Sequence, residues 1–234
     1  MLVLDDVQYT YQRELFRFDL TIGHGQIVSL MGPSGAGKST LLALVAGFIN
    51  PDQGDIFVGG ESIVLKEPYQ RPFSMLFQEH NLFAHLSVRD NISLGLHPGL
   101  KLTPEQKSQV EQAAQQVGVA EYLDRLPEHL SGGQRQRVAL ARCFVQPHLM
   151  WLLDEPFSAL DPVLREEMLG LVKKLAAERG ITVLMVTHHL SDAKAIATHF
   201  AFVAGGKIEA AGEISELSTE HPSQVLQAFV RAAG

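Results

Sequence analysis

Apolar residues fall into two kinds of run along this chain, and each kind predicts a different type of strand. A segment that alternates apolar with polar residues, 16–22, predicts a half-buried strand of an antiparallel layer. Nearly unbroken apolar runs predict parallel strands buried on both faces, and they occupy 27–31, 149–153 and 182–186. Shorter strands are expected at 55–58, at 74–77 and in a hairpin over 200–208. The pattern predicts an α/β fold with an antiparallel β layer.

Helical signals dominate the middle of the chain. Thr103 and Gln106 have capping-box spacing, and Pro104 occupies the first helical position between them. Ser131 is a candidate N-cap for a second helix, whose Val138 and Ala141 fall on one face. We therefore expect an α-helical subdomain inserted at about 79–148, a core formed by about 1–78 and 149–211, and a short C-terminal tail at 212–234.

Length, composition and charge limit the possible functions. With 234 residues, 46% of them hydrophobic, the chain can bury a sizeable core as one domain. The net charge of −7 argues against a dedicated nucleic-acid-binding protein, which needs a positive surface. Cys143 is the only cysteine, so neither an internal disulfide nor a thiolate metal cluster can form. No apolar run approaches the roughly 18 residues of a membrane span, and the first residues lack a signal-peptide pattern. We expect a soluble, cytoplasmic chain.

The stretch after the 27–31 strand carries the clearest chemistry. It fits G-x-x-x-x-G-K-S/T and lies between a predicted strand and an apolar helical pattern, which is the context of a phosphate-binding loop. The loop N–H groups and the helix N-terminus would face a polyphosphate, Lys38 would reach the β- and γ-phosphates, and Ser39 would bind Mg²⁺. The candidate nucleotide-binding residues are Gly32, Pro33, Ser34, Gly35, Ala36, Gly37, Lys38, Ser39 and Thr40.

Polar residues follow three of the predicted parallel strands, where ligands gather in such sheets. Asp154 and Glu155 end the 149–153 run, and two carboxylates there are costly without a role. Asp154 fits the support of Mg²⁺, and Glu155 could orient and deprotonate water, although structural ion pairing is an alternative. Gln78 could touch Mg²⁺ or the attacking water, or be an ordinary loop residue. His188 follows the 182–186 strand and, taken alone, could be a surface histidine.

Two further features are candidates for nucleotide contact. A Ser-Gly-Gly helix start is a second possible phosphate-binding end, formed by Ser131, Gly132, Gly133 and Gln134, although a simple capped helix is the alternative. Tyr9 and Tyr11 precede the 16–22 strand, where an aromatic side chain could stack on adenine or simply pack in a strand.

With these motifs identified, the chain resembles the ATP-binding-cassette ATPases over nearly its full length. The resemblance includes the phosphate loop, Gln78, LSGGQ at 130–134, LLDEP at 152–156, Ser158-Ala159-Leu160-Asp161, and His188, all in the family order. It implies a P-loop NTPase core that hydrolyses ATP with Mg²⁺, with catalytic roles for Glu155, His188 and Gln78. Gln78 would also join Ser39 and Asp154 around the metal.

The same resemblance implies a head-to-tail homodimer. Each ATP would be held between one subunit's phosphate loop and the other's Ser131, Gly132 and Gly133. Asp161 would signal across the interface, and Tyr11 is preferred to Tyr9 for stacking on adenine. Many family members have an acidic residue where this chain has His189, which leaves open which histidine faces the nucleotide; His188 is preferred by its position after the strand.

The segment 71–103 is similar to the corresponding part of bacterial thiamine importer ATPases. That resemblance implies membrane permease subunits, a periplasmic substrate-binding protein as an indirect partner, and a peripheral place on the inner membrane. Phe83, His85 and Leu86 would then contact the permease. Another importer or an exporter is the main alternative. Non-transport members of the family fit less well. A DNA-repair cassette protein would need a long coiled coil between the phosphate loop and LSGGQ, for which this chain is too short, and a ribosomal cassette protein usually has two cassettes, whereas this chain has one.

Overall fold

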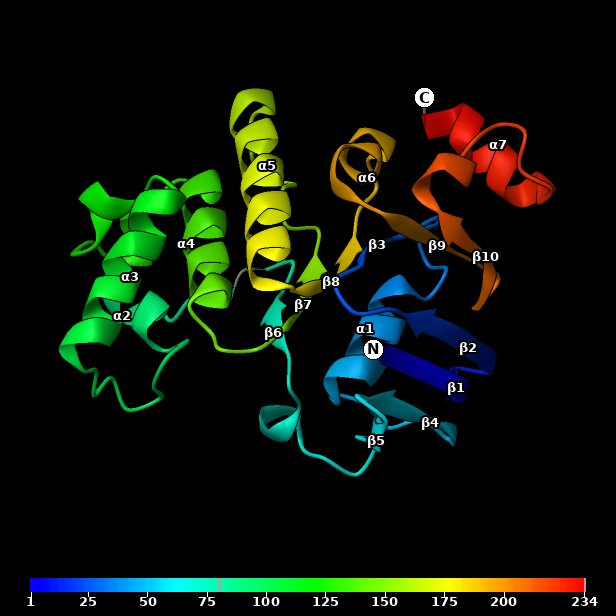
Figure 1. The fold of residues 1–234 in the computed structure, drawn as a ribbon, viewed down its shortest axis with the longest axis horizontal. Helices are drawn as coiled ribbons and strands as arrows, with labels where there is room; N and C mark the ends of the chain where they lie inside the picture. Colours follow the sequence, from blue (N-terminus) through cyan, green and yellow to red (C-terminus); the bar gives the residue numbers. More distant parts are fainter. Residues whose placement is uncertain (80, 234) are drawn as a thin grey trace.

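The computed structural model describes residues 1–79 and 81–233, and it contains one ten-stranded sheet. The strand order is β5-β4-β1-β2-β10-β9-β3-β8-β7-β6, so a parallel half and an antiparallel half share one sheet (Figure 1). The strands are β1 (Leu2–Tyr11), β2 (Glu14–Ile22), β3 (Ile27–Met31), β4 (Gln53–Val58), β5 (Glu61–Ser62), β6 (Ser74–Leu76), β7 (Met150–Asp154), β8 (Thr182–Val186), β9 (His199–Ala204) and β10 (Lys207–Glu213). The predicted α/β class is confirmed.

The parallel half is formed by β9, β3, β8, β7 and β6. Every residue of β3 and β8 is buried, as expected for strands covered on both faces. Alternate side chains enter two different cores: Leu153 packs on the side of the helical region, while Leu152 faces α1 and the antiparallel strands. This double burial explains why these strands have continuous apolar sequences.

The antiparallel half begins with β1, which pairs with β2 on one edge and with β4 on the other. A bulge interrupts both pairings near Asp6, whose φ is 45°. β2 alternates exposed and buried residues as its sequence predicts. Gly205 and Gly206, with φ of 55° and 74°, form the predicted two-residue turn between β9 and β10.

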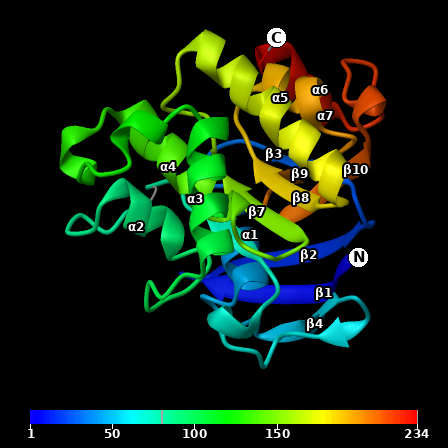
Figure 2. The same ribbon diagram turned by 60° about the vertical axis from the view of Figure 1, so that its left-hand side comes forward.

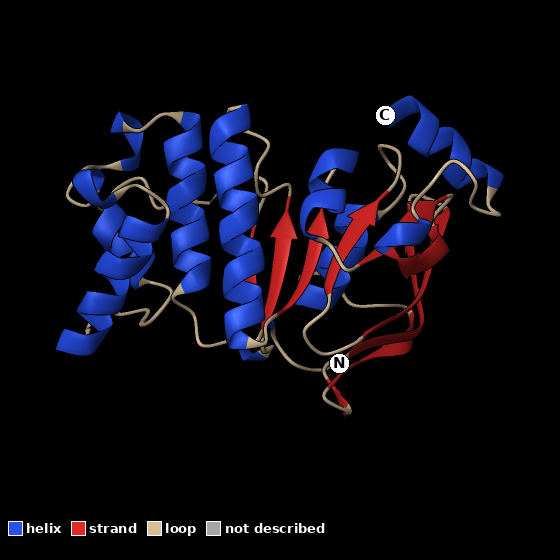
Figure 3. Cartoon of the chain, turned by 45° about the horizontal axis from the view of Figure 1, so that its top comes forward, coloured by secondary structure: helices blue, strands red, loops and turns tan. Residues whose placement is uncertain are grey.

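Helices cover both faces of the parallel strands and form a separate group beside them (Figures 1 and 2). Helix α5 packs on one face, α1 fills the space between the other face and the antiparallel strands, and α2, α3 and α4 pack on one another at the β6 edge. The α-helices are α1 (Lys38–Ala46), α2 (Val88–Ser93), α3 (Pro104–Gln116), α4 (Gly132–Phe144), α5 (Pro162–Arg179), α6 (Leu190–Ile196) and α7 (Gln224–Ala233). Figure 3 shows helices on one side and mostly strands on the other.

Helix ends follow the capping chemistry of the sequence. The side chains of Thr103 and Ser131 each accept a hydrogen bond from the N–H of the residue three positions on. The side-chain oxygens of Gln106 and Gln134 accept one from the N–H groups of Thr103 and Ser131, which completes two capping boxes. Gly47 ends α1 with a φ of 85°, where a side chain would also meet the buried guanidinium of Arg71. The helix starts are therefore set by local sequence.

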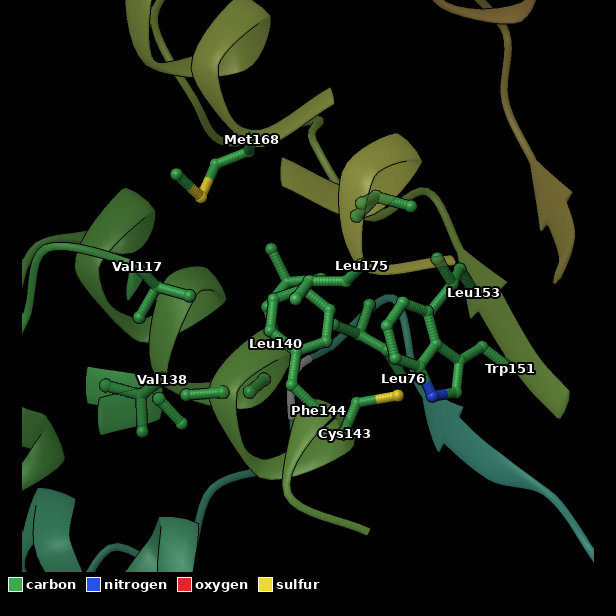
Figure 4. Close-up of a cluster of buried hydrophobic side chains, with 14 of the residues drawn as sticks. Leu76, Val117, Val138, Leu140, Cys143, Phe144, Trp151, Leu153, Met168 and Leu175 are labelled. Atoms are coloured by element: carbon green, nitrogen blue, oxygen red, sulfur yellow. The ribbon is translucent and has the colours of Figure 1, made fainter. Parts of the chain in front are cut away.

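The larger core joins the helical group to the sheet (Figure 4). Trp151 of β7 is fully buried and stacks on Phe144 of α4, with ring centroids 4.9 Å apart. Leu140 and Cys143 of α4, and Leu175 of α5, belong to the same core. Since α4 also begins within the LSGGQ segment, this packing connects that segment to the strand that ends in Asp154.

After β10, the chain forms a 3₁₀ turn (Ile214–Glu216) and then α7, whose Leu226 and Val230 pack against β9. β10 extends two residues into the predicted tail. The division into core, helical subdomain and tail stays a prediction, and His80 and Gly234 within it lie outside the described residues. A search of the described residues finds no helix with the length and apolar character needed to cross a membrane.

Candidate active site

The phosphate loop connects β3 to α1, as its flanking sequence predicts. Its glycines adopt backbone conformations that other residues avoid: φ is 146° at Gly32, 76° at Gly35 and 107° at Gly37. A Cβ atom at Gly32 would lie 2.1 Å from the carbonyl oxygen of Val203, and one at Gly37 would lie 2.7 Å from the ring of Phe16. Both positions require glycine for conformation and for space.

Lys38 is the first residue of α1 and is only 6% exposed. Its Nζ donates hydrogen bonds of 2.8 Å to the carbonyl oxygens of Gly32 and Pro33, so the ammonium lies within the loop. Burial lowers the pKa of Lys38, and the carboxylates of Glu155 and Asp154 oppose that shift. The loop is therefore a positively charged cradle that faces two acidic residues.

Asp154 ends β7 and is partly buried. Burial, together with the neighbouring Glu155, raises the pKa of its carboxyl group, while His188 and Lys38 act in the opposite direction. Within the described residues its Oδ1 is buried and has no hydrogen-bond partner. A buried acceptor without a donor is costly, which marks a place where a cation fits.

Glu155 lies at the centre of the residues that the sequence predicts for hydrolysis. Its Oε1 is 2.5 Å from Nε2 of His188, and its Oε2 accepts a 3.4 Å hydrogen bond from the amide of Gln78. Glu155 has a φ of 48°, a left-handed conformation that is rare outside glycine and often found at functional sites. Three strand ends, those of β6, β7 and β8, thus bring the three predicted catalytic side chains together.

A hollow of about 400 Å³ lies in front of the loop. Tyr11, at the end of β1, lines it together with Lys38, Glu155 and His188, whereas Tyr9 packs against the core. The rest of its lining comes from Glu14, Phe16, Ser34, Gly35, Gly37, Ser39, Thr40 and Val186. The geometry favours Tyr11 over Tyr9 as the aromatic residue beside the nucleotide.

Ser131, Gly132, Gly133 and Gln134 are not among the described residues that line this hollow. The amide of Gln134 is occupied within its capping box, where its Oε1 accepts a 2.8 Å hydrogen bond from the N–H of Ser131. These capping hydrogen bonds define the start of α4. The structure therefore separates the second candidate phosphate site from the first within one chain.

Asp161 caps α5, where its Oδ1 accepts from the N–H groups of Val163 and Leu164, each at 3.1 Å. His189 is the exposed N-cap of α6, one residue beyond the contact between His188 and Glu155. His188, not His189, lines the hollow, which supports His188 as the residue nearer the nucleotide.

Comparison with known proteins identifies the family. The sequence profile described as "ABC transporter" matches residues 15–158, more than half of the chain. This chain belongs to the ABC transporter family. A curated family member from Vibrio parahaemolyticus, the "Thiamine import ATP-binding protein ThiQ", is 89% identical over the full length of both chains. The protein of the same name from Vibrio cholerae is 68% identical over all of this chain and 98% of its own.

Two solved ABC structures of the ATP-binding cassette MJ0796 share the fold. The first, described as dimeric and bound to ADP and Pi in a post-hydrolysis state, has a TM-score of 0.83 and 28% identity. The second, also dimeric, has a TM-score of 0.81 and 28% identity; each alignment covers 92% of this chain and 99% of the other. The predicted family and ABC ATPase fold are confirmed.

One buried residue near the site escaped the motif analysis. Gln136 of α4 is fully buried, and its amide contacts the backbone around Glu155. The signal was present, since Gln136, Leu140 and Cys143 share one helix face by spacing, and a glutamine among buried residues needs partners. Pattern reading does not reveal which partners those are.

Proposed function

We propose that this chain is the ATP-hydrolysing subunit of a bacterial thiamine importer. The convergence of Lys38, Glu155 and His188 on one hollow supports ATP hydrolysis. The full-length relative at 89% identity, whose name specifies thiamine import, supports thiamine as the transported solute. The alternatives to a thiamine importer are an importer of another solute and an exporter of similar size.

In this proposal the loop residues 32–40 wrap the β- and γ-phosphates of ATP, with backbone N–H groups and the N-terminus of α1 directed at the charge. Lys38 stabilises the negative charge that spreads over the phosphoryl oxygens. Glu155 orients a water molecule in line with the γ-phosphorus and accepts its proton as the new bond forms. His188 holds the Glu155 carboxylate from one side and Gln78 from the other.

The residues present also fit Mg²⁺. Asp154 offers a buried carboxylate oxygen with no donor, and oxygen ligands are those that Mg²⁺ prefers. Ser39 lines the hollow in front of the loop, as does Glu155, the residue after Asp154, and the amide of Gln78 reaches Glu155. When bound, the ion would neutralise phosphate charge; Ser39, Asp154 and Gln78 would hold it directly or through water.

The raised pKa of Asp154 leads to a stability prediction. Asp154→Asn removes a charge whose burial and repulsion by Glu155 outweigh its attraction to Lys38 and His188, so without Mg²⁺ and ATP the variant should be more stable at pH 7 by about 1 kcal/mol. The native carboxyl retains its proton to a higher pH than the unfolded one, so the advantage of the variant should grow as pH rises above about 4 and level off above the native pKa.

Thermal unfolding of both proteins across this pH range, in chelator and then with Mg²⁺ and ATP, measures that advantage. The wild-type chain should gain stability from Mg²⁺ with ATP, and the variant should gain much less. Equal gains in both proteins would exclude Asp154 from the metal site.

A head-to-tail homodimer completes the site in this proposal. Ser131, Gly132 and Gly133 of one subunit would bind the γ-phosphate held by the partner's loop, and Asp161 would lie at the contact. Two observations support it: the signature helix start lies outside its own chain's hollow, and two structural relatives are described as dimeric.

The permease would bind near the end of β6. Phe83 is 49% exposed and lies edge-on to His85, with ring centroids 6.2 Å apart, which leaves two aromatic rings available to a partner. Buried Asn91 donates hydrogen bonds to the carbonyl oxygens of Phe83 and Leu86 and so fixes this loop. Attachment of Phe83, His85 and Leu86 to permease subunits would place the chain on the cytoplasmic face of the inner membrane, with a periplasmic substrate-binding protein as indirect partner.

Deletion of the gene tests whether thiamine is the transported solute. High-affinity uptake of labelled thiamine should fall to the level of passive entry, and the wild-type gene, but not the Glu155→Gln variant, should restore it. Uptake of an unrelated solute serves as the control and should not change. Undiminished thiamine uptake in the deletion strain would contradict the thiamine assignment and leave the ATPase assignment in place.

A further inference from the structure

The side-chain amide of Gln136 lies in the second turn of α4 and is fully buried. Its Nε2 donates to the carbonyl oxygen of Glu155 at 3.0 Å and lies 3.5 Å from Oγ of Ser158. Its Oε1 accepts a 3.0 Å hydrogen bond from the N–H of Ala159. Within the described part of the chain, this amide therefore contacts Glu155, Ser158 and Ala159, all among the five residues that follow β7.

These contacts hold Glu155 in its unusual backbone conformation. The N–H of Glu155 donates to the carbonyl oxygen of Val186 in β8, and its own carbonyl oxygen also accepts from the N–H and the hydroxyl of Ser158. A non-glycine residue with a φ of 48° is retained only when surrounding contacts fix it. Among residues 1–79 and 81–233, Gln136 supplies the one backbone contact to Glu155 that comes from the helical group.

The start of α4 packs on the same segment. A Cβ atom at Gly133 would lie 3.2 Å from the carbonyl oxygen of Ala159 and 3.3 Å from Leu160. Side-chain hydrogen bonds and backbone packing thus join the Ser-Gly-Gly helix start to the segment 155–160. A shift of the helix would move the peptide that carries the Glu155 side chain.

We propose that Gln136 is a positioning residue for Glu155. Through Gln136, the position of α4, the signature helix that begins within LSGGQ, would determine the position of the carboxylate that orients water. This inference rests on the proposed function, in which that helix contacts the ATP held by the partner subunit. One subunit would then sense phosphate at one site with Ser131 and adjust Glu155 at the other through Gln136. The two ATP sites of the dimer would be coupled by a hydrogen bond within each chain.

Gln136→Met tests the proposal, because Met has nearly the same volume and lacks the amide. We expect kcat for ATP hydrolysis by the purified full-length chain to fall about 10- to 100-fold, since a displacement on the order of 1 Å can cost a hundredfold. The KM for ATP and the ATP-dependent dimer should change less than about threefold, because the phosphate loop is untouched. Gln146→Met is the matched control. It removes a 3.3 Å hydrogen bond from the side-chain amide of Gln146 to the carbonyl oxygen of Arg142 at the other end of α4, and its kcat should equal that of the wild type.

A double-mutant cycle separates positioning from general damage. In the Glu155→Gln background, Gln136→Met should cause little further loss, because the residue it positions no longer acts as a base. Gln136→Glu keeps an acceptor for the N–H of Ala159 but no donor for Glu155, so it should fail to rescue. A wild-type kcat in Gln136→Met, or a full additional loss in the double variant, would overturn the proposal. An inactive wild-type chain would instead contradict the proposed ATPase function.

Discussion

Glu155→Gln is expected to bind ATP normally and to lose ATP turnover by roughly a hundred- to ten-thousand-fold, the usual cost of losing a general base. Glutamine keeps the size of the side chain and can still contact His188, but it cannot accept the proton of the attacking water. The structure adds a second reason. The carboxylate of Glu155 lies between His188 and Gln78, and the neutral amide of a glutamine would contact both residues more weakly.

The ATP-bound dimer of this variant should accumulate, because the dimer can close on ATP but cannot hydrolyse it to reopen. Size-exclusion chromatography in ATP and Mg²⁺, run beside a phosphate-release assay, measures both effects. Glu178→Gln on α5 is the matched control, since it removes an exposed carboxylate 3.9 Å from Lys174 and should leave turnover unchanged. A near-wild-type rate for Glu155→Gln would mean that another group is the base, and His188 would be tested next.

The parts of the fold that could be predicted from the sequence are those fixed by local chemistry. The strands at 27–31 and 182–186 have the predicted limits, because double burial makes them continuously apolar and polar turns bound them. The capping box at Thr103 and the N-cap at Ser131 could also be predicted, because each depends on residues a few positions apart; that Gln134 completes a second capping box is seen only in the structure. The order of the motifs then indicated that three strand ends would share one site.

Features set by distant contacts could not be predicted. β1 has a bulge and mixed burial, so its sequence lacks a simple alternation even though it pairs on both edges. The left-handed conformation of Glu155 depends on partners at Val186 and Gln136, which are 31 and 19 residues away in sequence. A motif can identify the carboxylate, but only the packed structure shows what holds it in place.

An active site shared between two subunits predicts that two inactive variants will complement each other in a mixed dimer. Lys38→Ala removes the buried cation from the loop and should abolish ATP-dependent dimerisation. Ser131→Arg should leave ATP binding to the monomer largely intact, because Ser131 lies outside that chain's own hollow, and should also abolish the ATP-retaining dimer. If each site combines Lys38 of one subunit with Ser131 of the other, a mixture of the two variants contains heterodimers with one intact site.

In that heterodimer the Ser131→Arg chain supplies a wild-type Lys38, and the Lys38→Ala chain supplies a wild-type Ser131. With Glu155→Gln added to both chains so that hydrolysis cannot reopen the dimer, the mixture should recover ATP-retaining dimers that neither variant forms alone. Their yield should be roughly half of that of the Glu155→Gln chain if the chains pair at random, with one ATP per dimer. Chromatography with radiolabelled ATP measures the nucleotide that elutes with the dimer. Recovery requires the two residues to act on one ATP from different subunits. Failure of the mixture, with both variants folded and the Ser131→Arg monomer still binding ATP, would place Ser131 outside the partner's site.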